Sequence, residues 1–215
     1  MASAMERLDF TLLTDGSSDA ILIEPIAWLL RQHLNIPING TWADLRRLRK
    51  PPKALREKVE AALDLYPCDI LFIHRDAEGE AHAKRVEEIA AAVAQLPTFP
   101  VPVVTIRMQE AWLLIDEQAL RRAAGNPNGR IAIEMPAIER LEKIPNPKQV
   151  LHDLLLAASE LAGRRRQTLK PGEKARRLGA LIEDYGPLRR LSAFQAFEAA
   201  TLAALGAGND LSRDE

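Results

Sequence analysis

Acidic residues follow three short apolar runs of the sequence. Asp15 follows the first run, Asp76 and Glu78 follow the second, and Glu110 comes just after the third. If the runs are parallel strands, their carboxyl ends lie at one edge of a sheet, where such proteins bind ligands. Carboxylates held close together repel each other, and a bound Mg²⁺ or Mn²⁺ is the usual remedy. We therefore expect Asp15, Asp76 and Glu78 to bind metal and Glu110 to assist in catalysis.

Each of these acids also has a purely structural interpretation. Aspartate after a strand is a common turn residue and helix cap, so a single acid at such a position indicates little. Acids at the ends of three successive runs favour a functional site over a series of independent turns.

The elements that would position these acids are strands that alternate with helices. We expect strands at residues 8–14, 69–73 and 103–106, as parallel neighbours in one sheet, and a short edge strand at 38–42. Runs this apolar are typical of strands that are buried on both faces. The alternation predicts an α/β fold, in which helices cover both faces of a mainly parallel sheet.

Helices account for most of the remaining chain. Those of the α/β part are expected at residues 19–34, where Pro25 predicts a kink or two pieces, at 51–66, from about 80 to 95, and from 110 onward. Beyond residue 124 short helices predominate, at 147–161, 173–185 and 192–205. We therefore expect an α/β core at residues 1–124, a helical extension packed on it at 125–205, and a flexible tail at 206–215.

Basic residues concentrate in two segments, at residues 46–58 and 164–177. In the second segment, KPGEK (residues 170–174) forms a turn that leads into a helix, and a helix start with nearby lysines suits an anion. We expect Lys170, Lys174 and Arg177 to bind phosphate there. Such contacts hold a nucleic-acid backbone without reading its sequence. The alternative, which we favour for the first segment, is a solvated helix face.

The polar segments that follow the strands together resemble a known family. They are TDGSSD (residues 14–19), HRDAEGE (74–80) and EAWLLID (110–116). Toprim domains carry a glutamate and a glycine-containing turn after the first strand, and Asp-x-Asp after a later one. The chain most resembles the Toprim-like domain-of-unknown-function family numbered 4276, also in PNPK (145–148) and SAFQAF (192–197). The resemblance covers nearly the whole chain and implies a Toprim-like, Rossmann-like core.

The resemblance also implies a function. Toprim-like proteins of this kind are metal-dependent nucleases or related phosphodiesterases, so it implies Mg²⁺ or Mn²⁺ as cofactor and nucleic acid as substrate. Similar proteins often occur with an ABC-type ATPase in phage-defence gene pairs. The resemblance therefore implies such an ATPase as partner and a role in antiviral defence.

Two residues depart from the Toprim pattern. Asp15 stands where Toprim enzymes have a glutamate that usually acts as the general acid or base. The aspartate side chain is shorter, so the alternative role for Asp15 is to bind metal without acting as an acid or base. His74 stands at the first aspartate of Asp-x-Asp, and imidazole is a poor ligand for Mg²⁺. His74 either donates a proton to a leaving oxygen or caps the strand through a backbone hydrogen bond. The alternative function is a catalytically silent binding or regulatory subunit of the same ATPase.

Composition excludes several other classes. The net charge is −1, so any contact with a polyanion has to come from local clusters of charge. The single cysteine, Cys68, excludes an internal disulfide and a cysteine-rich zinc site. The sequence has no Walker-type phosphate loop, no nucleophile elbow and no apolar run long enough to span a membrane. We expect a cytoplasmic protein that neither crosses a membrane nor binds ATP by itself.

Overall fold

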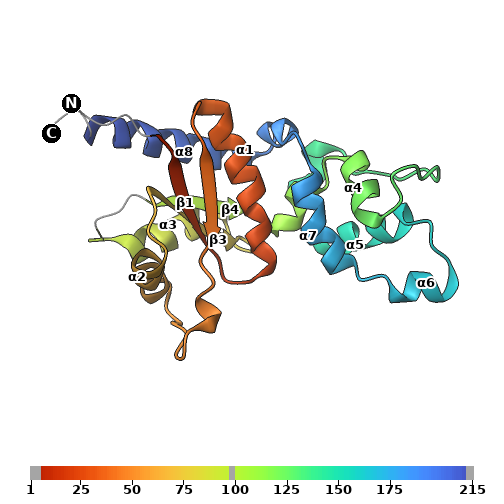
Figure 1. Ribbon diagram of the computed structural model, residues 1–215, viewed down its shortest axis with the longest axis horizontal. Helices are drawn as coiled ribbons and strands as arrows, with labels where there is room; N and C mark the ends of the chain where they lie inside the picture. Colours follow the sequence, from red (N-terminus) through yellow and green to blue (C-terminus); the bar gives the residue numbers. More distant parts are fainter. Residues whose placement is uncertain (1–5, 97–99, 212–215) are drawn as a thin grey trace.

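The computed structural model of the chain describes residues 6–96 and 100–211, with side chains up to residue 207. Its strands form one sheet of four parallel strands in the order β2-β1-β3-β4 (Figure 1). They are β1 (Leu8–Leu13), β2 (Ile38–Trp42), β3 (Ile70–Asp76) and β4 (Val101–Thr105). The predicted α/β fold is confirmed, with a sheet that is parallel throughout and compatible with a Rossmann-like fold.

The central strands β1 and β3 are buried on both faces, as their continuous apolar runs predict. Successive side chains along them point to opposite sides. Phe10 and Phe72 face one hydrophobic cluster, whereas Leu71 and Ile73 face the other. At the β1–β2 pairing, Gly40 lies opposite Phe10, and a Cβ at this position would collide with the Phe10 ring. The glycine therefore leaves room for the Phe10 ring against β2.

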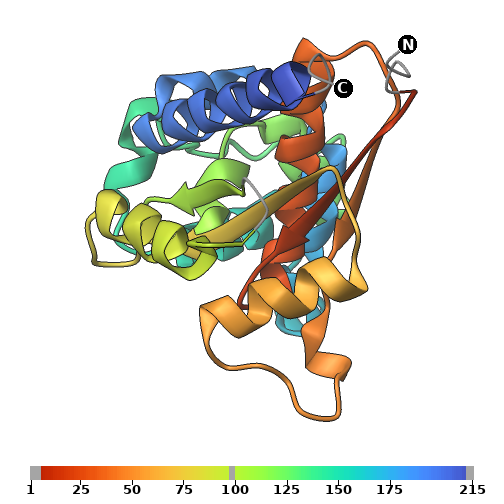
Figure 2. The ribbon, with the colours of Figure 1, turned by 90° about the vertical axis from the view of Figure 1, so that its left-hand side faces the viewer.

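Helices cover both faces of the sheet (Figure 2). The first face is covered by α1 (Ile23–His33) and α8 (Ser192–Leu211), and the second by α2 (Leu55–Leu65) and α3 (His82–Val93). The crossover helices α1 and α2 therefore lie on opposite faces, so the strand order reverses between β1 and β3. In open parallel sheets this reversal opens a crevice at the carboxyl ends of the two strands, which is where ligands bind.

Helix α8 belongs to the sheet's core although it lies at the end of the chain. Phe197 packs against Phe72 of β3, with ring centroids 6.0 Å apart, and Phe194 packs edge-on against Trp112 at 5.1 Å. The chain thus returns to the sheet after the intervening helices. The helix also continues to Leu211, so residues 206–211 are helical where we predicted a flexible tail; residues 212–215 lie outside the described residues.

The segment between β4 and α8 forms a helical unit beside the sheet (Figure 1). Three of its helices pack on one another: α4 (Glu117–Ala124), α5 (Pro147–Ala158) and α7 (Pro171–Leu181). The short α6 (Gly163–Thr168), which has no buried residue, lies between α5 and α7 in the chain. Short 3₁₀ helices connect the elements: η1 (Ser18–Leu22), η2 (Leu45–Arg47), η3 (Gln109–Leu113), η4 (Ile138–Lys143) and η5 (Gly186–Arg190). None of the helices in the described residues is both long and apolar enough to cross a membrane.

Two predicted helices begin differently in the structure. The predicted helix at residues 19–34 forms two pieces, η1 and α1, which confirms one of the two outcomes expected there. Pro25 lies in the first turn of α1, where its missing N–H is harmless. The helix expected from residue 110 starts as η3, a 3₁₀ helix. The following α-helix begins only after Asp116, whose carboxylate caps it by accepting a hydrogen bond from the Ala119 N–H at 2.9 Å.

Candidate functional site

The crevice between β1 and β3 brings most of the predicted acids together. A cavity of about 110 Å³ at the carboxyl ends of these strands is lined by Asp15, His74, Asp76 and Glu78. Glu110 does not line it; this residue borders a neighbouring cavity at η3. The predicted set is therefore divided between two adjoining cavities.

His74 and Asp76 lie on the same side of β3, which continues three residues beyond its predicted end at residue 73. His74 is buried, and its Nδ1–H donates to the carbonyl oxygen of Val103 at 2.8 Å. This is the backbone hydrogen bond that we considered for His74. It directs Nε2 toward Asp76, whose Oδ1 lies 3.3 Å away, but no hydrogen bond forms between them.

The pKa of His74 results from opposing effects. Burial by itself would lower it, because the charged imidazolium is poorly solvated. The carboxylates of Asp76 and Asp19 and the carbonyl of Val103 together outweigh burial and raise the pKa above its ordinary value. The neighbouring carboxylates therefore favour the protonated form of the ring.

Asp76 is held in place through only one of its oxygens. Its Oδ1 accepts hydrogen bonds from Thr105 Oγ1 at 2.6 Å and from the backbone N–H of Gln109 at 3.1 Å. Thr105 of β4 is the residue paired with Asp76 of β3 in the sheet. Oδ2 receives no hydrogen bond from any described residue, so it remains available to a ligand in the cavity.

Asp15 is already paired with two cations. Its Oδ1 lies 2.6 Å from Lys58 Nζ on α2, and its Oδ2 lies 3.0 Å from Arg75 Nε. Arg75 stands between His74 and Asp76 in β3, so its side chain points to the opposite side of the sheet. The alternation of the strand thus places the ion pairs of Asp15 on the α2 side, away from the hydrogen bonds of Asp76.

Asp19 is the buried acid of the first motif, and we did not assign it to the site from the sequence. Its Oδ2 accepts from the Gly16 N–H at 3.0 Å, and its Oδ1 accepts from Ser18 Oγ at 2.8 Å and from Gln109 Nε2 at 2.9 Å. The carboxylate therefore fixes the β1 turn and links it to η3. The signal for Asp19 was its place at the end of TDGSSD, which we interpreted as a helix start.

Unpartnered polar atoms concentrate around this crevice. Five buried side-chain nitrogen or oxygen atoms of the described chain have no hydrogen-bond partner, and three of them are Nε2 of His74, Oε1 of Gln109 and Oε2 of Glu110. Each such atom costs roughly 1–3 kcal/mol when it stays unsatisfied. Burial also raises the pKa of Glu110, to which the charges of Asp76 and Asp19 add. These atoms mark the crevice and the neighbouring cavity as the candidate functional site.

The donors of the crevice fit a divalent metal ion only in part. No three His, Cys, Asp or Glu side chains of the described chain already stand in the arrangement of a metal site. His74 Nε2 and Asp76 Oδ2 are two donors without protein partners, and Glu78 is exposed at the same cavity. One ion held by these residues would complete its shell with water or phosphate oxygens. An imidazole ligand suits Mn²⁺ better than Mg²⁺.

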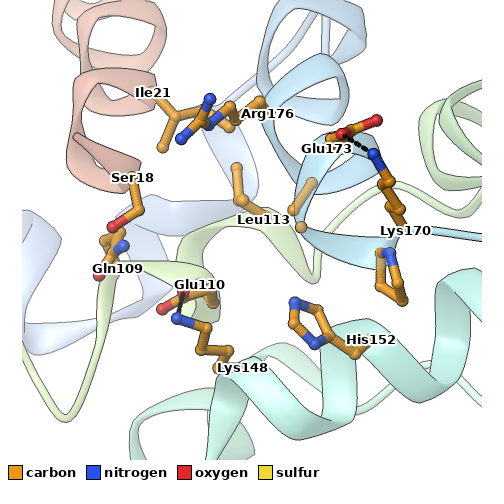
Figure 3. A pocket seen from close by; sticks show the side chains of 13 residues that line it. Ser18, Ile21, Gln109, Glu110, Leu113, Lys148, His152, Lys170, Glu173 and Arg176 are labelled. Carbon is orange, nitrogen blue, oxygen red and sulfur yellow. Dashed lines mark hydrogen bonds and ion pairs between the residues drawn. The ribbon is translucent and has the colours of Figure 1, made fainter.

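The predicted phosphate-binding residues are only partly brought to the site. Lys170 lines the cavity that Glu110 borders, which has a volume of about 560 Å³ (Figure 3). Lys174 and Arg177 do not line it; the Nζ of Lys174 lies beside Gly125 at the end of α4. Sequence reasoning missed two cations that line this cavity, Arg176 on α7 and Lys148 on α5. The helical rotation of α7 turns Arg176 toward the cavity and its neighbour Arg177 away.

Comparison of the chain with protein-family models, with curated proteins and with solved structures found no match. The described fold and site define an α/β protein whose all-parallel sheet carries buried and partly buried acids at the carboxyl edge of its central strands.

Proposed function

We propose that the protein is a metal-dependent phosphodiesterase that acts on nucleic acid through a Toprim-like site. The observation that carries the proposal is the cluster of unpartnered buried atoms of His74, Gln109 and Glu110, beside the carboxylates of Asp76 and Asp19. Structural carboxylates are normally satisfied within the protein. A site left incomplete in this way suits a cation and the oxygens of a substrate.

His74, Asp76 and Glu78 would hold Mn²⁺ or Mg²⁺. Asp15 would join them only after releasing Lys58 or Arg75. A divalent ion bound there supplies charge stabilisation at the phosphoryl oxygens. The hydrogen bonds from Thr105 and Gln109 keep the Asp76 carboxylate in a fixed orientation, and the Val103 carbonyl fixes the tautomer of His74.

Two arginines of the same cavity would hold the phosphate. Arg75 and Arg85 both line it, and each also forms an ion pair with Glu88, at 2.9 Å. Their shared carboxylate partner holds both guanidinium groups beside the acids, where planar donors suit phosphate oxygens. Glu110, whose pKa is raised by burial, would retain a proton closer to neutral pH and so assist as a general acid.

The resemblance to the Toprim-like family supports the wider proposal. The protein would act in the cytoplasm with an ABC-type ATPase in antiviral defence, and the ATPase would restrain or direct the nuclease activity. The altered Asp15 and His74 positions distinguish this site from the usual Toprim arrangement and favour Mn²⁺.

A cleavage assay tests the proposal. The purified protein is incubated with single-stranded and double-stranded DNA and RNA in the presence of Mn²⁺ or Mg²⁺. We expect cleavage that requires the metal and is lost in Asp76→Ala. Asp64→Ala, which removes an exposed acid on α2, should cleave like the wild type. Equal loss in both variants, or cleavage that persists in chelator, would rule out the proposed site.

The ion pairs of Asp15 favour a second candidate function. Lys58 and Arg75 compensate the Asp15 carboxylate directly, which suits a catalytically silent Toprim fold that serves as a binding or regulatory subunit of an ATPase. The two functions differ in one observable. A silent subunit would bind the partner ATPase but give no metal-dependent cleavage, either alone or in the complex.

A further inference from the structure

A second cavity lies between the α/β unit and the helical unit, next to the acidic crevice. It has a volume of about 560 Å³, within the range of about 300–1,000 Å³ that is usual for small-molecule sites. Its wall is formed by η1 and η3 on one side and by α5 and α7 on the other (Figure 3). Helix α7 approaches η1 so closely that a Cβ at Gly179 would collide with Ile21, so the wall is firmly packed.

The cavity combines an unpartnered buried carboxyl group with cations. Glu110 is only 6% exposed, and its Oε2 has no hydrogen-bond partner. Its Oε1 lies 3.9 Å from Lys148 Nζ, too far for a hydrogen bond. Lys170 is paired with Glu173 at 3.0 Å, whereas Arg176 forms no ion pair with any described residue. Arg176 is therefore the cation most available to an anionic ligand.

Part of the remaining lining is apolar, beside the polar side chains of Ser18, Gln109 and His152. Ile21 of η1, Leu113 of η3 and Ala175 of α7 contribute to the wall. A lone phosphate ion would leave this part of the cavity empty, because phosphate offers no apolar surface. A ligand with one anionic group and one flat, largely apolar group would occupy both parts, and a nucleotide has this composition.

Hydrogen bonds from two residues that line the cavity link it to the acidic crevice. Gln109 lines the cavity, while its Nε2 and its backbone N–H donate to Asp19 and Asp76 in the crevice. Ser18 likewise lines the cavity and donates to Asp19. Arg176 stands at the boundary with a further surface groove that Trp42 and Arg46 line. A strand that crosses the crevice would thus have one nucleotide beside Glu110.

We propose that this cavity is a nucleotide-binding pocket that holds the unit next to the cleaved phosphate, with Arg176 on its phosphate and Leu113 against its base. The statement that the bound nucleotide is part of a cleaved strand rests on the proposed function. The pocket itself is independent of metal, so its binding is measurable separately.

The test measures binding of adenosine 5′-monophosphate and thymidine 5′-monophosphate by calorimetry without added metal. We expect both to bind, and Arg176→Ala to weaken them about tenfold or more, because a charge-assisted hydrogen bond is lost. Arg177→Ala is the matched control, since it removes the same charge from the next residue of α7 outside the cavity; it should bind like the wild type. Ribose 5-phosphate and inorganic phosphate should bind more weakly, because they lack the base.

Each result is decisive when the variants melt at the wild-type temperature. Absence of binding by both nucleotides at millimolar concentration would overturn the inference, as would equal binding of inorganic phosphate. Equal losses in Arg176→Ala and Arg177→Ala would show a diffuse charge effect and overturn it as well. If nucleotides bind as expected but no cleavage is measured, the nucleotide pocket is supported and the proposed nuclease function is contradicted. If cleavage is measured but nucleotides do not bind, only the nucleotide pocket is contradicted.

Discussion

Nε2 of His74 lies 3.3 Å from Oδ1 of Asp76, while Nδ1 of the same ring is bound to the carbonyl oxygen of Val103 at 2.8 Å. A metal-binding histidine usually donates its second N–H to a carbonyl or carboxylate in this way. In the proposed metal site, this imidazole would take the place of the first carboxylate of the Toprim Asp-x-Asp. This replacement has consequences for the choice of metal.

The metal preference should depend on His74. We expect the wild type to bind Mn²⁺ more tightly than Mg²⁺ and His74→Asp to shift the preference toward Mg²⁺, because an all-oxygen site suits the harder ion. Competition between the two ions, followed by calorimetry or by Mn²⁺ relaxation, measures the shift. An unchanged preference in His74→Asp would exclude the imidazole from the shell of the ion.

Asp15 should matter less to metal binding than Asp76. Its carboxylate is half exposed, and Lys58 and Arg75 already compensate its charge. We expect Asp15→Asn to change the Mn²⁺ affinity little, and Lys58→Ala to strengthen it, because the released carboxylate can turn to the ion. Stability should change by no more than about 1 kcal/mol in either variant, as is usual for exposed pairs. A loss in Asp15→Asn as large as in Asp76→Asn would instead make Asp15 a direct ligand.

Glu110 should lower the stability of the fold at neutral pH. Its pKa in the folded protein is raised above the ordinary 4.5, chiefly by burial. Its contribution to stability is therefore fully present below the unfolded pKa and is lost as the pH rises through the folded pKa. Glu110→Gln should melt higher than the wild type at pH 7, by about 2–4 °C for each kcal/mol recovered, and the difference should vanish in acid.

The matched control for Glu110 is Glu87→Gln on α3, where the side chain is exposed. This variant should melt like the wild type at every pH. If Glu110→Gln lowers the melting temperature at pH 7, the Glu110 carboxylate makes a stabilising interaction that its raised pKa does not reflect. Glu110 would then not be an unsatisfied residue of the candidate site.

Helix α8 should be essential to the stability of the sheet. Phe197 is 1% exposed and packs against Phe72 and Trp112. Phe197→Ala should reduce the free energy of unfolding by about 3–5 kcal/mol, the usual cost of deleting a buried phenylalanine. Leu202→Ala, on an exposed position of the same helix, should cost within about 0.5 kcal/mol. If denaturant unfolding shows that both variants lower the free energy of unfolding by similarly small amounts, α8 does not stabilise the core.

The sheet could be predicted because its central strands are continuous apolar runs. The sequence of β3 did not reveal its true end, since His74, Arg75 and Asp76 are polar; their pairing with β4 extends the strand. That extension places Arg75 and Asp76 on opposite sides of the sheet. The return of α8 to the sheet was not predictable either, because it depends on contacts between residues far apart in sequence, such as Phe72 and Phe197.

The structure brings most of the predicted acids to one crevice but places Glu110 at a neighbouring cavity. Asp15 and Asp19 are the same residue type in the same motif, and only the fold shows that Asp19 is buried against Gln109 whereas Asp15 pairs with Lys58. On α7, Arg176 and Arg177 are indistinguishable by residue type. The rotation of the helix decides which one faces the cavity, and that rotation is set by packing against α4, α5 and η1.

Calorimetric titration of the wild-type protein with Mn²⁺, compared with Asp76→Asn, tests the central claim most directly. Asp64→Asn on the outer face of α2 is the control of equal charge change. The proposed site predicts one Mn²⁺ per chain in the wild type and in Asp64→Asn, and affinity weaker by about tenfold or more in Asp76→Asn. No binding by the wild type at millimolar Mn²⁺, or the same affinity in Asp76→Asn, would contradict a metal site at the carboxyl edge of β3.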